Sequence, residues 1–169
     1  VTLIPGTMQN VWRNSGFGLA SPDEDGRVAA LSFAEDVRRR VHDLTDSVGD
    51  GSVAFVQVHS APTGRAGRDA FARSLEELVA GDWAGARLVI EHCDRLIEGR
   101  TPEKGFLSLE DEISVALATG VGIHINWGRS CLEERDPEAP ERHIRQAAES
   151  GVLTGVVFSG ASDSPTIYG

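Results

Sequence analysis

The chain has 169 residues, of which 40% are hydrophobic, and this is enough to bury the core of one domain. Its 26 acidic residues outnumber 16 basic ones, which gives a formal net charge of -10. A broad nucleic-acid surface needs a clustered basic face, and the one dense basic run, Arg38 to Arg40, lies among acidic residues in a helical pattern. No apolar run is as long as a membrane span. We therefore expect neither a nucleic-acid partner nor a membrane contact.

The cysteines, Cys93 and Cys131, are two only and lack metal-type spacing. This fits a reducing compartment better than a disulfide scaffold, so we expect a cytoplasmic protein. Val1 to Ile4 already reads as a strand, and no initiating methionine precedes it. We expect one α/β domain over residues 1–169, and we expect it to be a piece of a longer polypeptide.

Strand-like and helix-like patterns alternate along the chain. The predicted strands cover residues 1–4, 53–58, 88–94, 121–126 and 156–158. Apolar residues at three- and four-residue steps predict helices over 27–48, 69–79, 106–118 and 141–150. Two polar or glycine-rich stretches, residues 7–26 and 131–142, are predicted to be loops.

The ends of four predicted strands fall at regular intervals. They lie at His59, Glu91, Asn126 and Ser159, spaced 32, 35 and 33 residues apart. Strand and helix in regular alternation predict a parallel sheet, whose strands are buried on both faces and therefore nearly all apolar. Two architectures fit: an incomplete (β/α)8 TIM barrel, or a flavodoxin-like open doubly wound sheet. The start within a strand favours the barrel, and in both folds ligands bind at the carboxyl ends of the strands.

Glu91 is the leading candidate for chemistry. It follows the apolar residues 88–90, and a carboxylate at the edge of a core must be paired, coordinated to a metal, or carry a raised pKa. We predict that it acts as metal ligand or base, or else forms an ion pair with Arg129. His59 ends the preceding strand and is predicted to act as acid or base. Because side chains alternate along a strand, His92 should point away from Glu91 and pack under a helix.

Two strand tips supply candidates for substrate binding. The amide of Asn126 suits a sugar hydroxyl, and Arg129 could clamp a carboxylate or phosphate. Trp127 could stack on a sugar ring or simply plug the barrel mouth. Ser159 lies in a small-residue loop whose free amides favour anions. Cys93 is predicted to be a buried, unreactive thiol.

Seven segments occur in the order PGTM, FGLASPDEDGR, VQVHSAP, LVIEHCD, KGFLSLEDEI, HINWGRS and VVFSGAS. Together they resemble an uncharacterised family of the xylose-isomerase-like superfamily, which includes sugar isomerases, sugar-phosphate epimerases and related endonucleases. The resemblance implies a (β/α)8 barrel nearly twice as long as this chain. It also implies isomerase or epimerase chemistry on one divalent ion (Mn, Mg or Zn), with Glu91 as a metal ligand. The chain departs from the pattern where Asn126 and Arg129 replace an aspartate and a histidine, and where Ser159 replaces a histidine.

Three hypotheses follow for function. The first is a sugar isomerase or epimerase that acts on a small polyhydroxylated carbonyl compound. The second is a metal-free barrel that binds a sugar or acidic metabolite without turnover. The third is a flavodoxin-like ligand-binding module, which the order of strands in the sheet distinguishes from the first two. The expected partner is a small-molecule substrate, and self-association into a homo-oligomer is left open.

Overall fold

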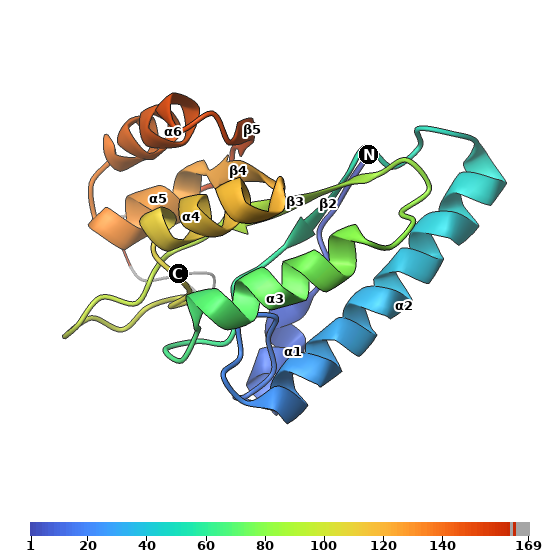
Figure 1. Cartoon of the computed structure of the whole chain (residues 1–169). Coiled ribbons are helices and arrows are strands. Elements are labelled where there is room, and N and C mark those ends of the chain that lie inside the picture. Colours follow the sequence, from blue (N-terminus) through green and yellow to red (C-terminus); the bar gives the residue numbers. More distant parts are fainter. Residues whose placement is uncertain (163, 165–169) are drawn as a thin grey trace.

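The computed structural model describes residues 1–162 and 164 and contains one sheet of five parallel strands (Figure 1). The strands are β1 (Thr2–Leu3), β2 (Phe55–Val58), β3 (Arg87–His92), β4 (Gly122–Asn126) and β5 (Leu153–Val157). Each strand pairs with its successor in the chain, so the order is β1-β2-β3-β4-β5. Consecutive order is that of a half-barrel, and the predicted incomplete TIM barrel is confirmed. The flavodoxin-like alternative is wrong, because its strand order reverses at a switch point.

Six helices connect the strands of the described part of the chain. They are α1 (Thr7–Arg13), α2 (Glu24–Val48), α3 (Arg68–Val79), α4 (Leu109–Thr119), α5 (Trp127–Glu134) and α6 (Ala139–Glu149). Neighbouring helices pack against one another, α2 on α3, α3 on α4 and α5 on α6 (Figure 1). This layer covers one side of the sheet, as parallel crossover connections require.

Two of these helices replace predicted loops. The stretch 7–26 contains α1, whose Val11 is buried against the core although its neighbours are polar. The stretch 127–134 forms α5, which Asn126 caps by accepting a hydrogen bond from the backbone N–H of Arg129. Composition was misleading in both places, because α1 depends on the buried contact of Val11 and α5 on its cap at Asn126.

The core lies between the sheet and the helices. Three isoleucines leave the strands on the helix side and are fully buried: Ile90, Ile123 and Ile125. They belong to the same apolar cluster as Phe71 and Leu75 of α3. The alternate residues of β2, β3 and β4 leave on the other, barrel side. This alternation separates an apolar layer from the side chains that carry the chemistry.

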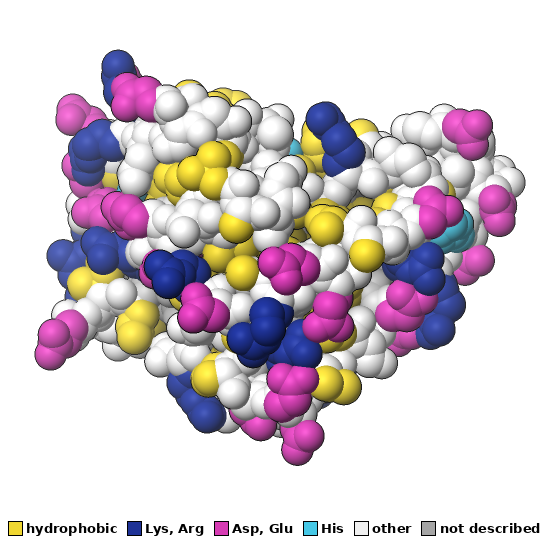
Figure 2. Space-filling view, in the orientation of Figure 1, with side chains coloured by type: hydrophobic (Ala, Val, Ile, Leu, Met, Phe, Trp, Pro, Cys, Tyr) yellow, Lys and Arg dark blue, Asp and Glu magenta, His cyan; other side chains and the backbone are white. Residues whose placement is uncertain are grey.

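The outer surface is mixed in charge. Figure 2 shows Lys and Arg side chains interspersed with Asp and Glu on the face that it draws. Arg27 is an exception among these charges because it is buried and joins α2 to α3. Its guanidinium is 2.7 Å from Glu24 and 2.7 Å from Glu77. Among the described residues, no helix combines the length and the apolar character needed to cross a bilayer.

Candidate functional site

A pocket of about 370 Å³ opens at the carboxyl ends of β2, β3 and β4. The strands contribute His59, Glu91 and Asn126, and α1 forms one wall. The polar side chains predicted at separate strand tips are thus brought to one place. Lys104 and Phe106, from the loop after β3, complete another side of the pocket.

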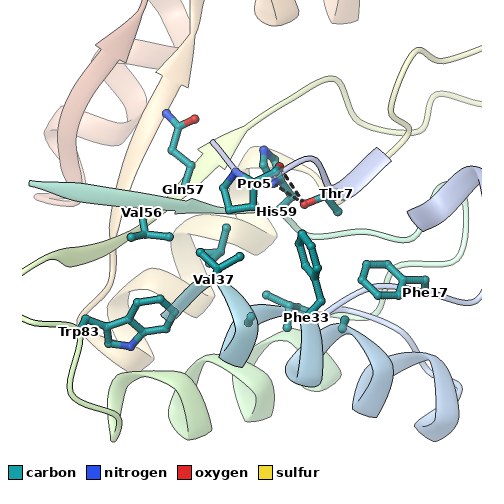
Figure 3. A pocket seen from close by; sticks show the side chains of 13 residues that line it. Pro5, Thr7, Phe17, Phe33, Val37, Val56, Gln57, His59 and Trp83 are labelled. Atoms are coloured by element: carbon teal, nitrogen blue, oxygen red, sulfur yellow. Dashed lines mark hydrogen bonds between the residues drawn. The ribbon is translucent and has the colours of Figure 1, made fainter. Parts of the chain in front are cut away.

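A chain of hydrogen bonds runs from Glu91 to α1. Oε2 of Glu91 lies 2.7 Å from Nε2 of His59, and Nδ1 of His59 lies 3.1 Å from the hydroxyl of Thr7. Figure 3 shows Thr7 and His59 joined above the apolar side chains of Val37 and Val56, which fill the space between β2 and α2. Both ring nitrogens of His59 therefore have partners, and the imidazole is fixed in orientation.

The amide of Asn126 holds the other oxygen of Glu91. Its Nδ2 donates to Oε1 of Glu91 at 2.6 Å. Its Oδ1 accepts from the backbone N–H of Arg129 at 3.2 Å and from the hydroxyl of Ser159 at 2.5 Å. These bonds fix which end of the amide faces Glu91. Asn126 thus orients the carboxylate, and Ser159 orients Asn126.

The carboxyl of Glu91 is shifted toward its charged form. Burial raises its pKa, but His59, through its hydrogen bond and charge, opposes this, and Asn126 and the charge of Arg129 act in the same direction as His59. The net effect holds the pKa of Glu91 below its ordinary value. At neutral pH Glu91 is therefore a carboxylate and a weak base.

Arg129 does not form the predicted ion pair with Glu91. Its nearest carboxylate is that of Glu103, 3.9 Å away, and its buried Nη1 has no hydrogen-bond partner among the described residues. The capping bond holds the backbone N–H of Arg129 on Oδ1 of Asn126, the end of the amide that faces away from Glu91. The guanidinium lines the pocket instead, as does Lys104.

Asp94 positions the loop that carries Lys104. Its Oδ2 accepts hydrogen bonds from the backbone N–H groups of Glu103 at 2.8 Å, Lys104 at 2.8 Å and Gly105 at 3.3 Å. The contact of Asp94 with Lys104 is thus made through the Lys104 backbone. Asp94 thereby holds a second cation at the pocket wall.

Trp127 lies outside the set of residues that line this pocket. Its ring packs on Phe158, with ring centroids 5.6 Å apart. Of the two interpretations left open by the sequence, this position is closer to an apolar cover than to a platform for a sugar ring.

Glu91, His59 and Cys93 could together contact a metal ion, because one donor atom from each lies within 4.8 Å of the others. Burial, and secondarily the charge of Glu91, raises the pKa of the Cys93 thiol well above its ordinary value. A protonated thiol is a poor ligand, in line with the prediction that Cys93 is unreactive. The imidazole and the carboxylate fit a divalent ion that accepts nitrogen and oxygen ligands.

A second polar cluster lies on the helix side of β3. Nδ1 of His92 is 2.7 Å from Oε2 of Glu112, whose Oε1 accepts a hydrogen bond from Ser60 at 2.5 Å. Burial opposes a charge on His92, but Glu112 and Glu133 raise its pKa to about 10. The prediction that His92 packs outward under a helix agrees with this position.

Sequence reasoning missed two residues of the pocket. Thr7 stood in a predicted loop, and Lys104 in a polar one, so neither belonged to a strand tip. The sequence offered only a weak indication of Thr7. It follows Pro5-Gly6, which end the first strand, and a side chain at that position can point into the pocket at the strand ends. Glu112 was also missed, although a carboxylate on the apolar stripe of a predicted helix is a sign of a buried partner.

Comparison with known proteins places these features in context. The family model described as "Domain of unknown function (DUF4862)" matches residues 1–169. The uncharacterized protein STM3670 of Salmonella typhimurium is 36% identical over 167 residues, which are 96% of this chain and 53% of that protein. The chain therefore spans about half the length of this curated relative.

A solved structure has a similar fold. It is that of a "putative sugar phosphate isomerase/epimerase" from Anabaena variabilis, with a TM-score of 0.50 and 16% identity. The match covers 92% of this chain and 50% of that one. At this identity the comparison establishes the fold alone, and it agrees with a half-barrel.

Proposed function

Since the chain belongs to the DUF4862 family and folds as a half-barrel, we propose that it carries part of a sugar isomerase or epimerase site. The substrate is a small polyhydroxylated carbonyl compound bound at the carboxyl ends of the strands. The observation that carries the proposal is the 2.7 Å contact between His59 and Glu91 in a pocket at that position. The name of the Anabaena variabilis protein supports the same class of reaction.

In this proposal His59 moves the proton. Isomerisation removes a proton from the carbon beside the carbonyl and returns it to the neighbouring carbon, so one group must both accept and donate. Imidazole is the side chain most often used for such transfers. Nδ1 of His59 has the Thr7 hydroxyl as its partner at the pocket wall, and a substrate hydroxyl can take that place. Glu91 holds the ring from the other side through Nε2, because its low pKa makes it a poor base.

Glu91 is also the residue that would hold the divalent ion implied by the family resemblance. Such an ion, when bound, polarises the substrate carbonyl.

Arg129 and Lys104 suit an acidic group on the substrate. Both cations line the pocket, and Nη1 of Arg129 lacks a hydrogen-bond partner among the described residues. A guanidinium binds a carboxylate or phosphate through two parallel hydrogen bonds. We therefore propose a sugar phosphate or sugar acid as the substrate class.

The test is proton exchange. Full-length protein is incubated in D2O with a panel of aldoses, ketoses, their phosphates and sugar acids, and deuterium at the carbon beside the carbonyl is followed by NMR. We expect exchange with one acidic class, its loss in His59→Gln and a large decrease in Glu91→Gln. His42→Gln, which changes an exposed histidine of α2, is the matched control. Exchange that survives in His59→Gln would sink the assignment.

A metal-free binding protein is the second candidate. It is favoured because both oxygens of Glu91 already accept hydrogen bonds, from His59 and Asn126. This candidate predicts that an acidic sugar binds in calorimetry, that Arg129→Gln weakens it, and that no deuterium enters the ligand. Exchange in D2O decides between the two.

A further inference from the structure

Three ligand-type side chains converge on the helix side of β3, away from the pocket. They are His92 at the end of β3, Glu133 of α5 and His143 of α6, and they are 0%, 4% and 7% exposed. A nitrogen or oxygen from each lies within 4.8 Å of the others. Nε2 of His92 is 3.3 Å from Oε2 of Glu133, and Nε2 of His143 is 4.0 Å from Oε1 of the same carboxylate.

The buried Nε2 of His92 has no hydrogen-bond partner among the described residues. A buried polar atom left in this way is uncommon and points to a missing ligand. The contact with Glu133 is close, but its geometry is not that of a hydrogen bond. The atom therefore faces the carboxylate of Glu133 at 3.3 Å without a hydrogen-bond partner.

The other nitrogen of each ring is already held. Nδ1 of His92 lies 2.7 Å from Glu112, and Nδ1 of His143 lies 3.0 Å from the hydroxyl of Ser130. Both rings thus turn Nε2 toward Glu133. Histidines that bind metals in proteins are oriented in this way, with the second nitrogen bonded to a carboxylate or another oxygen.

Arg95 holds Glu133 from the opposite side. Its Nε donates to Oε1 at 2.9 Å and its backbone N–H to Oε2 at 3.0 Å, so both carboxylate oxygens are fixed. Each oxygen keeps a lone pair for the imidazole that faces it. The two negative charges of Glu133 and Glu112 exceed the one positive charge of Arg95, which favours a cation at this point.

We propose that His92, Glu133 and His143 bind a structural zinc ion that fastens α5 and α6 to the end of β3. Imidazoles and carboxylates both bind zinc in proteins, and burial of all three side chains keeps them away from solvent. Ligands of a tetrahedral zinc at about 2.0 to 2.1 Å stand about 3.3 to 3.4 Å from each other. The 3.3 Å contact already has this spacing, and the 4.0 Å contact needs a shift of several tenths of an ångström. Glu133 binds through one of its oxygens, so the three side chains supply three ligands.

The competing interpretation is a buried ion-pair network in which a proton, not a metal, occupies His92 between Glu112 and Glu133. The zinc site and the ion-pair network differ in metal content, because the network contains no metal ion. Binding of zinc displaces that proton from Nε2 and leaves the bond from Nδ1 to Glu112 in place. Metal content therefore separates them.

The test uses full-length Glu91→Gln protein, in which the proposed ion of the pocket has lost its carboxylate ligand. After dialysis against a chelator, zinc is titrated by calorimetry, bound metal is counted by mass spectrometry, and thermal unfolding is followed with and without zinc. We expect one zinc ion per chain and a higher Tm with zinc. A chain that binds no zinc in this variant overturns the proposal.

Variants locate the ion. In the Glu91→Gln background, His143→Gln should remove zinc binding. Ser130→Ala should weaken it roughly 10-fold, because the hydrogen bond that orients the His143 ring is lost. His42→Gln is the matched histidine control and should leave it unchanged. If His143→Gln does not fold, the zinc X-ray absorption spectrum of Glu91→Gln replaces it and should show two imidazole ligands. Zinc that remains in folded His143→Gln, or that lacks imidazole ligands, overturns the assignment.

The zinc proposal and the proposed function can be refuted independently of each other. Loss of deuterium exchange in His59→Gln tests the pocket and involves none of these three ligands. A zinc ion that binds wild-type protein but is absent from Glu91→Gln would place the metal in the pocket and not in this cluster.

Discussion

Glu91 and His92 are consecutive on β3, yet their side chains belong to separate networks on opposite faces of the sheet. Glu91 is 2.7 Å from His59 on the barrel side, and His92 is 2.7 Å from Glu112 on the helix side. The preceding strand repeats the pattern, since the residue after His59 is Ser60, which donates to Glu112. The dipeptides His59-Ser60 and Glu91-His92, at the ends of neighbouring strands, thus contribute to both the pocket and the buried cluster.

Thr7→Val tests the orientation of His59. Valine keeps the shape of threonine but removes the hydroxyl partner of Nδ1. A net hydrogen bond contributes about 0.5–1.5 kcal/mol, so we expect the rate of substrate deuterium exchange to fall roughly 2- to 10-fold with the fold intact. Initial rates and circular dichroism check this. Thr119→Val removes a comparable hydroxyl bond on α4, and an equal loss of exchange in that variant would contradict a specific role for Thr7.

Asn126→Asp restores the aspartate that the family resemblance expects. The new carboxylate would lie where Nδ2 now donates to Glu91 at 2.6 Å, so two negative charges would face each other. We expect a lower free energy of unfolding without metal and a tighter binding of divalent ions, because an ion would relieve the repulsion. Urea unfolding and calorimetry with MnCl2 measure the two effects.

The control is Asn14→Asp, which adds the same charge at an exposed position. This variant should change neither the free energy of unfolding nor the affinity for divalent ions appreciably. If metal affinity is the same in Asn126→Asp and wild type, Glu91 and residue 126 do not share a metal.

The sequence predicted the parts of this fold that depend on periodicity. Continuous apolar strands, the long helix α2 and the opposite orientation of Glu91 and His92 all follow from side-chain spacing. Contacts between distant segments do not: Thr7 meets His59 across 52 residues, and nothing local to either residue indicates the other. Arg129 was assigned the wrong partner for the same reason, since its position depends on the cap of a helix that its polar composition concealed.

Gly128→Ala tests the close approach of α5 to the end of β5. A Cβ at this position would lie 2.5 Å from the carbonyl oxygen of Gly160 and 2.5 Å from the Ser159 hydroxyl. The backbone must shift, which costs about 1–3 kcal/mol, and the bond from Ser159 to Asn126 should break. Urea unfolding and the side-chain amide NMR signal of Asn126 provide the measurements.

Gly160→Ala is the matched variant, because a Cβ there would meet nothing within 4 Å. It should unfold like the wild type and leave the amide signal of Asn126 in place. Equal destabilisation of both variants would show that the loop, and not the contact at Gly128, is responsible.

Arg27→Met tests the bridge between α2 and α3. Arg27 is buried and bonds Glu24, Glu77 and Ser74, so its loss should lower the Tm by about 2 to 4 °C or more. The hydrogen bond from Arg27 lowers the pKa of Glu24 below 4.5. The contribution of this pair is therefore present above pH 4.5 and is lost as pH falls through the lowered pKa.

We accordingly expect the difference in Tm between wild type and Arg27→Met to shrink in acid. Arg39→Met is the control, since Arg39 pairs with Asp36 on an exposed helix face. Such surface pairs contribute little, and its Tm should stay close to that of the wild type. A difference for Arg27→Met that does not change with pH would mean that the pair with Glu24 does not contribute to it.

The back-to-back placement of Glu91 and His92 restricts how the chain can change length during evolution. A register slip of one residue in β3 would turn both side chains to the wrong face at once. Insertions and deletions before the strand, next to the buried Trp83, are therefore costly. The exposed turn at residues 98–101, which follows both side chains, is where family members should differ in length.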